Sequence, residues 1–349
     1  MIKIMSKNFL IVFIILLFFS FIYIIHEQTN KLHSYELGNQ DSQTIKAPLK
    51  ATYMEPSIKT EKAYKSELNN FIECHKTPIN INEFSDKLKN KFYEIENHFK
   101  SSNGKVSFAY EDLYSGLHIS YNEKQKYFAA STIKAPVVLY IYNLYVNNKL
   151  DLNKTMKYQP SHYVEGSGTI KHQPYGEEFT IKELTEKTIV NSDNIAYKML
   201  TTAVNHYEIK QFWKSLEADT FWTNNNIWGQ INSKDGIIYM KELYKFTQKN
   251  PEISEELLNL YFSSVCKLIN INDKNIKIAH KSGWNSASIH DMAIVYHPEP
   301  YVISINSLLG YDNYNAFFNK ASNLINEFHT IYWNEKSNYC YQKTLKKTS

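Results

Sequence analysis

The chain has 349 residues, 43% of them hydrophobic and 15% aromatic, and carries a formal net charge of +4. This length allows one large domain with appendages or two small domains, and so mild a charge gives little support to a nucleic-acid partner. The sequence shows no Cys/His spacing typical of a metal site and no glycine-rich phosphate loop. We therefore expect a globular protein without a metal, a cofactor or a nucleic-acid partner.

An apolar run near the N-terminus predicts a membrane anchor. Residues Phe9–Ile25 form a stretch of 17 residues, at the short end for a membrane-spanning helix. Lys3 and Lys7 precede it, which favours an N-terminus inside the cell and an exported C-terminal bulk. No small-x-small cleavage site follows, so we expect an uncleaved single-pass anchor in the cell membrane. The alternative is a cleaved signal peptide and a secreted protein.

The composition of the chain divides it into five segments. We expect a cytoplasmic tip at residues 1–7, the anchor at 8–25, an extracytoplasmic stalk at 26–79, a folded domain at 80–333 and a basic tail at 334–349. The stalk is polar and shows no sustained period. The tail is polar too, and we expect it to be frayed.

Periodicity within the folded domain predicts both helices and strands. The first helix begins near Glu83, because apolar residues from Phe84 to Phe99 recur three or four positions apart on one face. Two strands are expected next, Lys105–Asp112 and Leu117–Asn122. The middle of the chain should be helical: one helix runs from Ser131 towards Asn147, one from the capping box at Thr180 to near Ser192, one begins near Asn194, and two more are Gly236–Gln248 and Ser254–Cys266. The last expected elements are strands Ile276–His280, Ile289–Tyr296 and Tyr301–Ser307 and helix Tyr314–Phe328. If there is a single core, the early and late strands must pair in one antiparallel sheet, with the middle helices forming a second lobe.

Three cysteines, Cys74, Cys266 and Cys340, lie far apart in the sequence. The odd number rules out a complete disulfide framework. We expect free thiols, at least one of them buried; a single bridge is the alternative.

The first chemical motif is Ser131-Thr132-Ile133-Lys134. A serine and a lysine three positions apart share one face of a helix, so the amine can reach the hydroxyl. The hydroxyl becomes a good nucleophile when a base removes its proton, and a lysine serves as that base when burial or another cation lowers its pKa. Ser-x-x-Lys occurs three times in the chain, but only Ser131 is flanked by small and apolar residues that favour a buried helix start.

Two further motifs follow in the chain. Ser192-Asp193-Asn194 contains a hydroxyl that could relay a proton and an amide that could hold Lys134 and a substrate, although the same residues are also common helix caps. In Lys281-Ser282-Gly283 the cation and the hydroxyl could bind a carboxylate, and the glycine lets a substrate approach the strand edge. The backbone N–H groups of Ser131 and Trp284 are candidates for an oxyanion hole.

With these motifs in order, residues 80 to 333 resemble the class A β-lactamase and penicillin-binding serine hydrolase family. The resemblance implies a two-lobed α+β fold, with a five-stranded antiparallel sheet covered by helices, an all-helical lobe, and a cleft between them. It implies an acyl-enzyme and a β-lactam or peptidoglycan stem-peptide substrate. It assigns Ser131 as nucleophile, Lys134 as general base, Ser192 as proton relay and Lys281 as carboxylate anchor. It also suggests that Glu165-Gly166-Ser167-Gly168 borders the cleft.

The sequence departs from the class A pattern in the segment before the third motif. Class A β-lactamases use a loop glutamate to activate the water that hydrolyses the acyl-enzyme. No Asp or Glu occurs between Asp219 and Asp235, where that residue is expected. Acylation could survive this loss, but deacylation should be slow unless Gln230, Asn232 or another group places the water. Ser282 replaces the commoner threonine and keeps the hydroxyl.

Three functions are compatible with this sequence. The first is a membrane-anchored β-lactamase that is acylated at Ser131 and hydrolyses the β-lactam amide. The second is a D-alanyl-D-alanine peptidase or penicillin-binding enzyme with slow deacylation, which the missing glutamate favours. The third is a catalytically silent cell-wall binding module. Covalent labelling of Ser131 distinguishes the third function from the other two.

Overall fold

The computed structural model describes residues 61–220, 222, 226–310 and 314–346. The predicted cytoplasmic tip and anchor lie outside the described residues, as does most of the predicted stalk. Among the described helices, none is both long enough and apolar enough to cross a membrane.

The domain is built on a five-stranded antiparallel sheet with strand order β2-β1-β9-β8-β7. The strands are β1 (Val106–Asp112), β2 (His118–Tyr121), β7 (Lys277–Trp284), β8 (Ile289–Tyr296) and β9 (Tyr301–Ser307). The early strand β1 pairs with the late strand β9, with Tyr110 opposite Ile303. The prediction that both ends of the domain contribute to one sheet is therefore confirmed.

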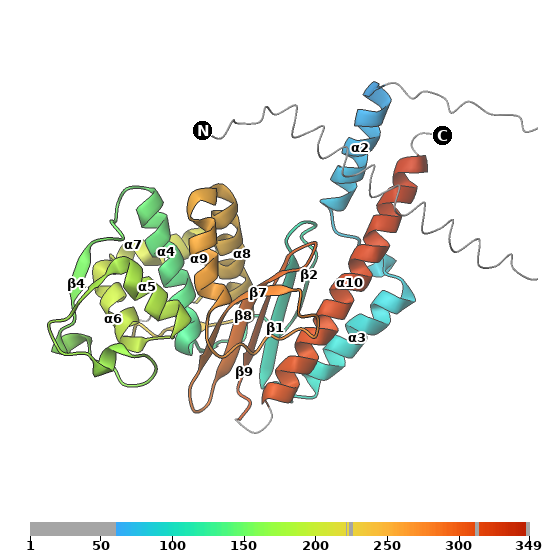
Figure 1. Ribbon diagram of the computed structural model, residues 1–349. Helices are drawn as coiled ribbons and strands as arrows, with labels where there is room; N and C mark the ends of the chain where they lie inside the picture. Colours follow the sequence, from blue (N-terminus) through green and yellow to red (C-terminus); the bar gives the residue numbers. More distant parts are fainter. Residues whose placement is uncertain (1–60, 221, 223–225, 311–313, 347–349) are drawn as a thin grey trace, which may run out of the picture. The chain divides into compact units, whose positions relative to one another are not determined.

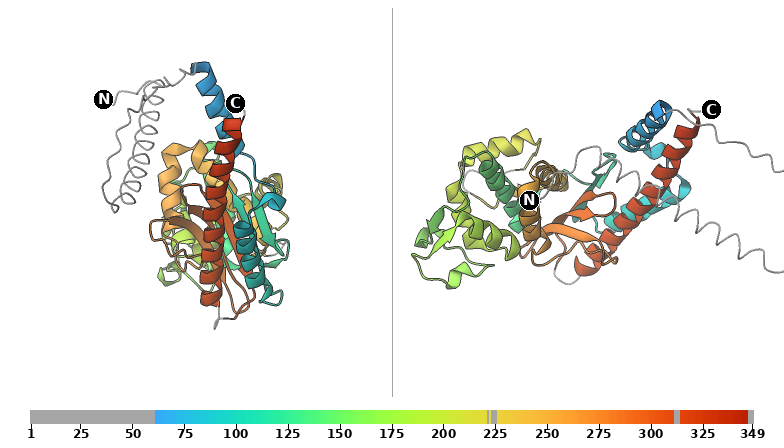
Figure 2. Two further views of the ribbon diagram at one scale, coloured as in Figure 1. Left: turned by 90° about the vertical axis from the view of Figure 1, so that its right-hand side faces the viewer. Right: turned by 45° about the horizontal axis from the view of Figure 1, so that its top comes forward.

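Helices cover both faces of this sheet (Figure 1). On one face lies α8 (Ser233–Lys249), followed by α9 (Pro251–Phe262) and the helical lobe. On the other face lie α3 (Asp86–Lys100) and α10 (Tyr314–Lys346), packed side by side (Figure 2). Side chains alternate between two cores across the sheet: Ala109 joins the core of the helical lobe, whereas Phe108 and Tyr110 join the core beneath α3 and α10.

The helical lobe surrounds α4 (Lys134–Val146), whose residues from Lys134 to Tyr142 are all buried. A helix that is apolar on every side belongs in an interior. The other helices of the lobe are α5 (Ile181–Val190), α6 (Asn194–Ala203) and α7 (His206–Ser215). Two pairs of short strands complete it: β3 (Tyr127–Phe128) pairs with β6 (Gln230–Ile231), and β4 (Thr155–Lys157) pairs with β5 (Glu178–Thr180). The predicted capping box is confirmed, since Thr180 and Glu183 exchange side-chain and backbone hydrogen bonds at the start of α5. The predicted α+β fold with a helical lobe is confirmed.

The prediction of a frayed basic tail is wrong for the described residues. Helix α10 does not end at Phe328 but continues to Lys346. Trp333 donates to Asp112 Oδ2 at 2.7 Å, and Tyr332 donates to Ser115 Oγ at 2.9 Å. Lys336 is buried and donates to the carbonyl of Thr77. These contacts with β1, with the turn after it and with the segment before α3 hold the polar C-terminal sequence in a helix.

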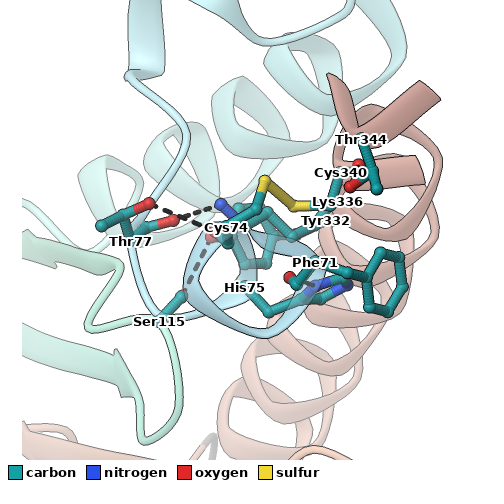
Figure 3. Close-up of a disulfide and its surroundings, with 9 residues drawn as sticks. All are labelled: Phe71, Cys74, His75, Thr77, Ser115, Tyr332, Lys336, Cys340 and Thr344. Atoms are coloured by element: carbon teal, nitrogen blue, oxygen red, sulfur yellow. Dashed lines mark hydrogen bonds between the residues drawn. A yellow bond between two sulfur atoms is a disulfide. The ribbon is translucent and has the colours of Figure 1, made fainter. Parts of the chain in front are cut away.

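The expectation of free thiols is wrong for two of the three cysteines. Cys74 and Cys340 form a disulfide, with Cα atoms 5.6 Å apart and a sequence separation of 266 (Figure 3). It joins α10 to α2 (Glu61–His75), a helix within the predicted stalk. Cys266 is free and exposed.

Candidate active site

Ser131 lies in a 3₁₀ turn, Ala130–Ile133, that leads directly into α4. Its hydroxyl oxygen is 3.1 Å from Nζ of Lys134, so the expected contact across one helical turn is present. The residue before it, Ala130, has a φ of +48°, a left-handed conformation that is uncommon for a non-glycine residue. Such strain is frequent where a fold must aim a reactive group.

Lys134 is fully buried, and its amine has four oxygen neighbours. Two are carbonyl oxygens, the backbone oxygen of Ser192 at 2.6 Å and Oδ1 of Asn194 at 2.8 Å. The others are the hydroxyls of Ser131 at 3.1 Å and Ser192 at 3.2 Å. A carbonyl only accepts hydrogen bonds, so these two fix two N–H groups of the amine. The lone pair of a neutral amine then faces the hydroxyls, where it can take a proton.

Electrostatics favour this neutral amine. Burial, and secondly the positive charge of Lys281, hold the pKa of Lys134 well below its usual range. Burial also lowers the pKa of Lys281, to about 8. Near neutral pH, Lys281 therefore keeps its charge while Lys134 is the group poised to act as a base.

Ser192 joins the two lysines. Its hydroxyl is within hydrogen-bonding distance of Nζ of Lys134 and, at 3.1 Å, of Nζ of Lys281. Lys281 can donate to this oxygen, and Lys134 can also donate to it once it has taken up a proton, which leaves the hydroxyl proton of Ser192 free to point elsewhere. Ser192 has a φ of +53°, so the backbone turns sharply just before α6.

Asp193 and Asn194 hold this turn in place. Asp193 caps α6 by accepting from Ile195 N and Ala196 N, and its second oxygen accepts from Thr169 N and Ile170 N at 2.6 and 2.9 Å. Asn194 donates through Nδ2 to the backbone oxygen of Glu165 at 2.7 Å. The second motif is thus a helix cap, and it also binds the loop that precedes it.

Gly283 lets strand β7 lie directly against the turn that carries Ser131. A Cβ atom at position 283 would come within 2.6 Å of the backbone nitrogens of both Ser131 and Thr132. Only a glycine permits so close an approach. The first and third motifs therefore meet through their backbones, next to the Ser131 and Trp284 peptide groups that the sequence suggests for an oxyanion hole.

Ser282 differs from its expected position. Its hydroxyl donates to the carbonyl of Val265 at 3.3 Å, and the side chain is fully buried. In this structure it does not face the cleft, so it would have to rotate before it could contact a substrate carboxylate.

A cleft of about 430 Å³ opens above Ser131. One wall is the Val164–Ser167 segment with Asn194, and the other is formed by Trp284 and Asn285 at the end of β7. The predicted residues Ser131, Asn194, Trp284 and Glu165 all line it, together with Phe128 and Trp228, which sequence reasoning missed.

Trp228 covers the base. Nζ of Lys134 lies 5.4 Å from the centre of the Trp228 ring and 5.9 Å from that of Tyr197. The two rings are 5.2 Å apart, and Tyr197 is held by its hydroxyl, which donates to Ile227 O and accepts from Trp222. The sequence shows only that a tryptophan precedes Gly229 and β6. The fold shows that its ring lies over the amine of Lys134.

Known proteins with a similar sequence or fold indicate the same kind of site. Residues 88–329 match the family model Beta-lactamase2, the β-lactamase enzyme family. The chain belongs to this family. As a member it is a serine hydrolase, which confirms the resemblance seen in the sequence.

Individual relatives of this β-lactamase-family protein are distant in sequence. β-Lactamase BRO-1 of Moraxella catarrhalis is 28% identical over 240 residues, which cover 62% of this chain and 75% of that protein. The solved structure of PBP-A is similar with a TM-score of 0.63 at 20% identity, covering 69% of this chain and 96% of that one. A β-lactamase of Sphaerobacter thermophilus has a TM-score of 0.59 at 16% identity, covering 68% of this chain and 95% of that one.

The nearest acids in sequence to the absent loop glutamate are engaged elsewhere. Asp235 is buried at the start of α8 and accepts hydrogen bonds from the backbone nitrogens of Asp219 and Thr220. Asp219 is exposed and pairs with Lys234 at 3.0 Å. Asn232, a sequence candidate for placing water, caps α8 through its side-chain oxygen. Among the described residues that line the cleft, Glu165 is the one with a carboxylate.

One group of described side chains has the composition of a metal site. His297, Glu299 and His329 place ligand atoms within 4.8 Å of one another at the turn between β8 and β9. Both ring nitrogens of His329 are already hydrogen-bonded, to the Tyr110 hydroxyl at 2.6 Å and to Glu299 O at 2.8 Å. His329 therefore has both ring nitrogens engaged within the protein, and the cluster lies at the opposite end of β8 from the residue that pairs with Trp284.

Proposed function

We propose that the enzyme opens the amide bond of β-lactams by forming an acyl-enzyme at Ser131. The observation that carries this proposal is the chain of contacts from Ser131 through Lys134 and Ser192 to Lys281. A neutral lysine beside a serine hydroxyl supplies the base, and a second, charged lysine supplies a site for the carboxylate that β-lactams carry. The structural relative PBP-A supports the proposal, since a mutant of it forms an acyl-enzyme with penicillin G.

The chemistry of acylation follows from the positions of these groups. Lys134 takes the proton of Ser131 as Oγ attacks the carbonyl carbon of the β-lactam. The backbone N–H groups of Ser131 and Trp284 stabilise the oxyanion. The C–N bond then breaks, and the proton passes from Lys134 through the hydroxyl of Ser192 to the departing nitrogen. The products are an ester at Ser131 and a ring-opened amine, and Lys134 is neutral again because the proton it took from Ser131 has passed to that amine.

The fate of the ester favours a second candidate function. Hydrolysis needs a base for water, and the described lining of the cleft offers no carboxylate on the segment from residue 219 to 235. Trp228 covers Lys134, the other candidate base. Slow deacylation is the property of a penicillin-binding peptidase, whose natural substrate is a D-alanyl-D-alanine stem peptide.

The experiment is intact-mass spectrometry of the full chain mixed with benzylpenicillin and followed over time. A persistent adduct of the drug's mass supports an acylating, slowly deacylating enzyme of cell-wall chemistry. Rapid consumption of the drug without a lasting adduct supports a β-lactamase. Ser131→Ala should abolish labelling, and Lys134→Ala should slow it by orders of magnitude; labelling retained in Ser131→Ala contradicts the assignment.

We also propose that the enzyme is held at the outer face of the cell membrane by the helix predicted at residues 8–25. The lysines before the apolar run support this orientation. The Cys74–Cys340 disulfide supports an oxidising compartment, where such bonds persist. A C-terminally tagged chain should sediment with membranes and retain its first 25 residues. A soluble chain that starts after residue 25 would instead establish signal cleavage.

A further inference from the structure

A buried histidine and a buried aspartate lie close to Lys281 but take no part in the acylation itself. His280 directly precedes Lys281 on β7, and Asp291 lies on the neighbouring strand β8; their side chains are 1% and 0% exposed. Nδ1 of His280 is 3.1 Å from Oδ1 of Asp291, and its Nε2 is 3.0 Å from the backbone oxygen of Ser264. A carbonyl and an ionised carboxylate only accept hydrogen bonds, so both ring nitrogens donate. The two side chains therefore form a buried ion pair.

This ion pair holds the 264–269 segment, which follows α9. His280 binds the backbone oxygen of Ser264, and Oδ2 of Asp291 accepts from the backbone nitrogens of Leu268 and Ile269 at 2.9 and 3.0 Å. The segment forms neither helix nor strand, so its backbone groups depend on partners of this kind. The pair thus fastens the segment to the sheet.

The same segment is bound to the helical lobe. Ser264 donates through Oγ to the backbone oxygen of Ile189 at 3.1 Å, and the backbone nitrogen of Val265 donates to the backbone oxygen of Val190 at 3.0 Å. Helix α5 ends at Val190, two residues before Ser192. The segment is therefore bonded both to the sheet and to the turn that leads to the second motif.

We propose that Asp291, paired with His280, is a positioning residue that sets the contact between Ser192 and Lys281 through the 264–269 segment. That contact, 3.1 Å from Oγ to Nζ, joins the helical lobe to the sheet. The inference rests on the proposed function, since the Ser192 hydroxyl is the proton relay of the acylation. It adds a pair of residues that do not line the cleft and act only through the backbone they hold.

The charge of Asp291 offers a rival explanation that must be separated from its position. Burial lowers the pKa of Lys281, and the negative charge of Asp291 partly offsets this. Asp291→Asn removes the charge and keeps the shape. The amide oxygen can still accept from the backbone of the 264–269 segment, and the amide NH₂ can donate to Nδ1 of a neutral His280. Asp291→Ala removes both the charge and the contacts.

Acylation of the full chain by benzylpenicillin tests the proposal. We expect Asp291→Ala to lower the second-order rate constant by about 10- to 100-fold, the order of effect of a displacement of about 1 Å. Asp291→Asn should stay within about threefold of the wild type, because its hydrogen bonds remain. The rising limb of the pH profile should move to higher pH in Asp291→Ala. Burial and the nearby charge of Lys281 lower the pKa of Lys134, and that charge would recede.

Two further variants make the comparison specific. Asp112→Ala is the matched control, since Asp112 is also fully buried and accepts from two backbone N–H groups, but on β1. It should lose stability and keep the wild-type pH profile. Ser264→Ala loses only the bond to Ile189 and should move the rising limb in the same direction as Asp291→Ala, by less. It keeps the test valid if Asp291→Ala does not fold.

Amide hydrogen exchange measures the segment without any reaction. The amides of Leu268 and Ile269 should exchange more than about tenfold faster in Asp291→Ala than in the wild type, because they lose a charged acceptor. In Asp291→Asn they should remain protected. Amides of the paired strands β1 and β9 report that each variant is folded.

The outcomes separate the positioning role from the function itself. Faster exchange in Asp291→Ala with the rate and pH profile of the wild type overturns the inference, as does an unmoved rising limb in Ser264→Ala when Asp291→Ala does not fold. Equal losses of rate in Asp291→Asn and Asp291→Ala also overturn it, because Asp291 would then act by its charge. A rising limb that moves as far in Asp112→Ala would reduce the effect to general stability. If benzylpenicillin does not acylate Ser131 in the wild type, the proposed function fails, whatever the exchange rates are.

Discussion

The amines of Lys134 and Lys281 meet at the hydroxyl of Ser192, at 3.2 and 3.1 Å. Two buried ammonium groups so close together repel each other, and each also loses the solvation that water would provide. The pair therefore holds one charge more readily than two. Because Lys281 retains a pKa of about 8, it is Lys134 that gives up its proton near neutral pH.

The first prediction concerns the pH dependence of acylation. The efficiency for benzylpenicillin should be high at pH 7 and fall as Lys281 loses its charge above pH 8, since a neutral amine no longer attracts the drug's carboxylate. Benzylpenicillin methyl ester, which lacks that carboxylate, is the matched control and should show no fall in this range. Equal profiles for acid and ester between pH 7 and 10 would contradict the role of Lys281.

The second prediction concerns the close approach at Gly283. Gly283→Ala places a Cβ atom 2.6 Å from two backbone nitrogens, neither of which is the end of a flexible side chain. We expect acylation to slow by about 100-fold, because a 1 Å displacement of reacting groups has effects of this order. Gly310→Ala is the control, since no atom lies within 4 Å of the added Cβ. A Gly283→Ala enzyme with wild-type rates would show that the strand and the turn can separate freely.

The third prediction concerns Trp228. Burial is the main cause of the lowered pKa of Lys134, so Trp228→Ala should admit water and raise that pKa. The rising limb of the acylation profile should move to higher pH, and the rate at pH 7 should fall. Trp228→Phe keeps a ring over the amine and should stay near the wild type. If the rising limb of Trp228→Ala does not move, other residues must keep Lys134 dry.

The fourth prediction concerns stability in acid. His290 is buried, with Nε2 donating to Phe128 O and Nδ1 accepting from Ser307 N, so its neutral form is fully bonded. Burial lowers its pKa from 6.5 to about 4. The unfolded chain then binds the extra proton first, so the stabilisation is complete above pH 6.5 and is lost as the pH falls towards 4.

Denaturant unfolding of the wild type and of His290→Gln at several pH values measures this effect. The difference in unfolding free energy between the two proteins should shrink by about 1.4 kcal/mol per pH unit as the pH falls through this window. Other titrating groups cancel in the difference. A difference that is independent of pH would show that His290 takes up a proton as readily in the fold as in the unfolded chain.

The fifth prediction concerns the disulfide. Cys74→Ser combined with Cys340→Ser opens a loop of 266 residues and should lower stability by about 2 to 5 kcal/mol. Ser131 labelling by benzylpenicillin should persist, since the bond holds α2 against α10 and not the cleft. Cys266→Ser, which removes the free thiol, is the control and should unfold as the wild type does. Loss of labelling in the double variant would tie α2 to the active site.

Much of this fold could be predicted because its signals are local. Alternating apolar and polar residues mark the strands, and the capping box at Thr180 marks the start of α5, so a short stretch of sequence is enough to predict each element. The extension of α10 was missed because its polar sequence is held by distant partners, such as Asp112 beneath Trp333. The disulfide was missed because a separation of 266 residues leaves no pattern from which a pairing can be deduced.

The candidate site, too, could be predicted where its signals are local motifs and not where they depend on distant residues. The motif order predicts Ser131, Lys134, Ser192 and Lys281 because the proposed chemistry requires those residue types, and the fold brings their side chains into one network. The sequence offers no comparable signal for Trp228. Its effect comes from a ring placed over an amine 94 positions earlier in the chain, which no local pattern reveals.

The covalent bond between α2 and α10 also has a mechanical consequence. A pull on the chain before Glu61 can unwind α2 at most as far as Cys74, because beyond that point the load passes through sulfur to Cys340 (Figure 3). Helix α10 then carries the force along its axis into the sheet, where Trp333 and Tyr332 fasten it. The turn that carries Ser131 packs into the core on the other face of the sheet from α10, so such a load would bypass the cleft.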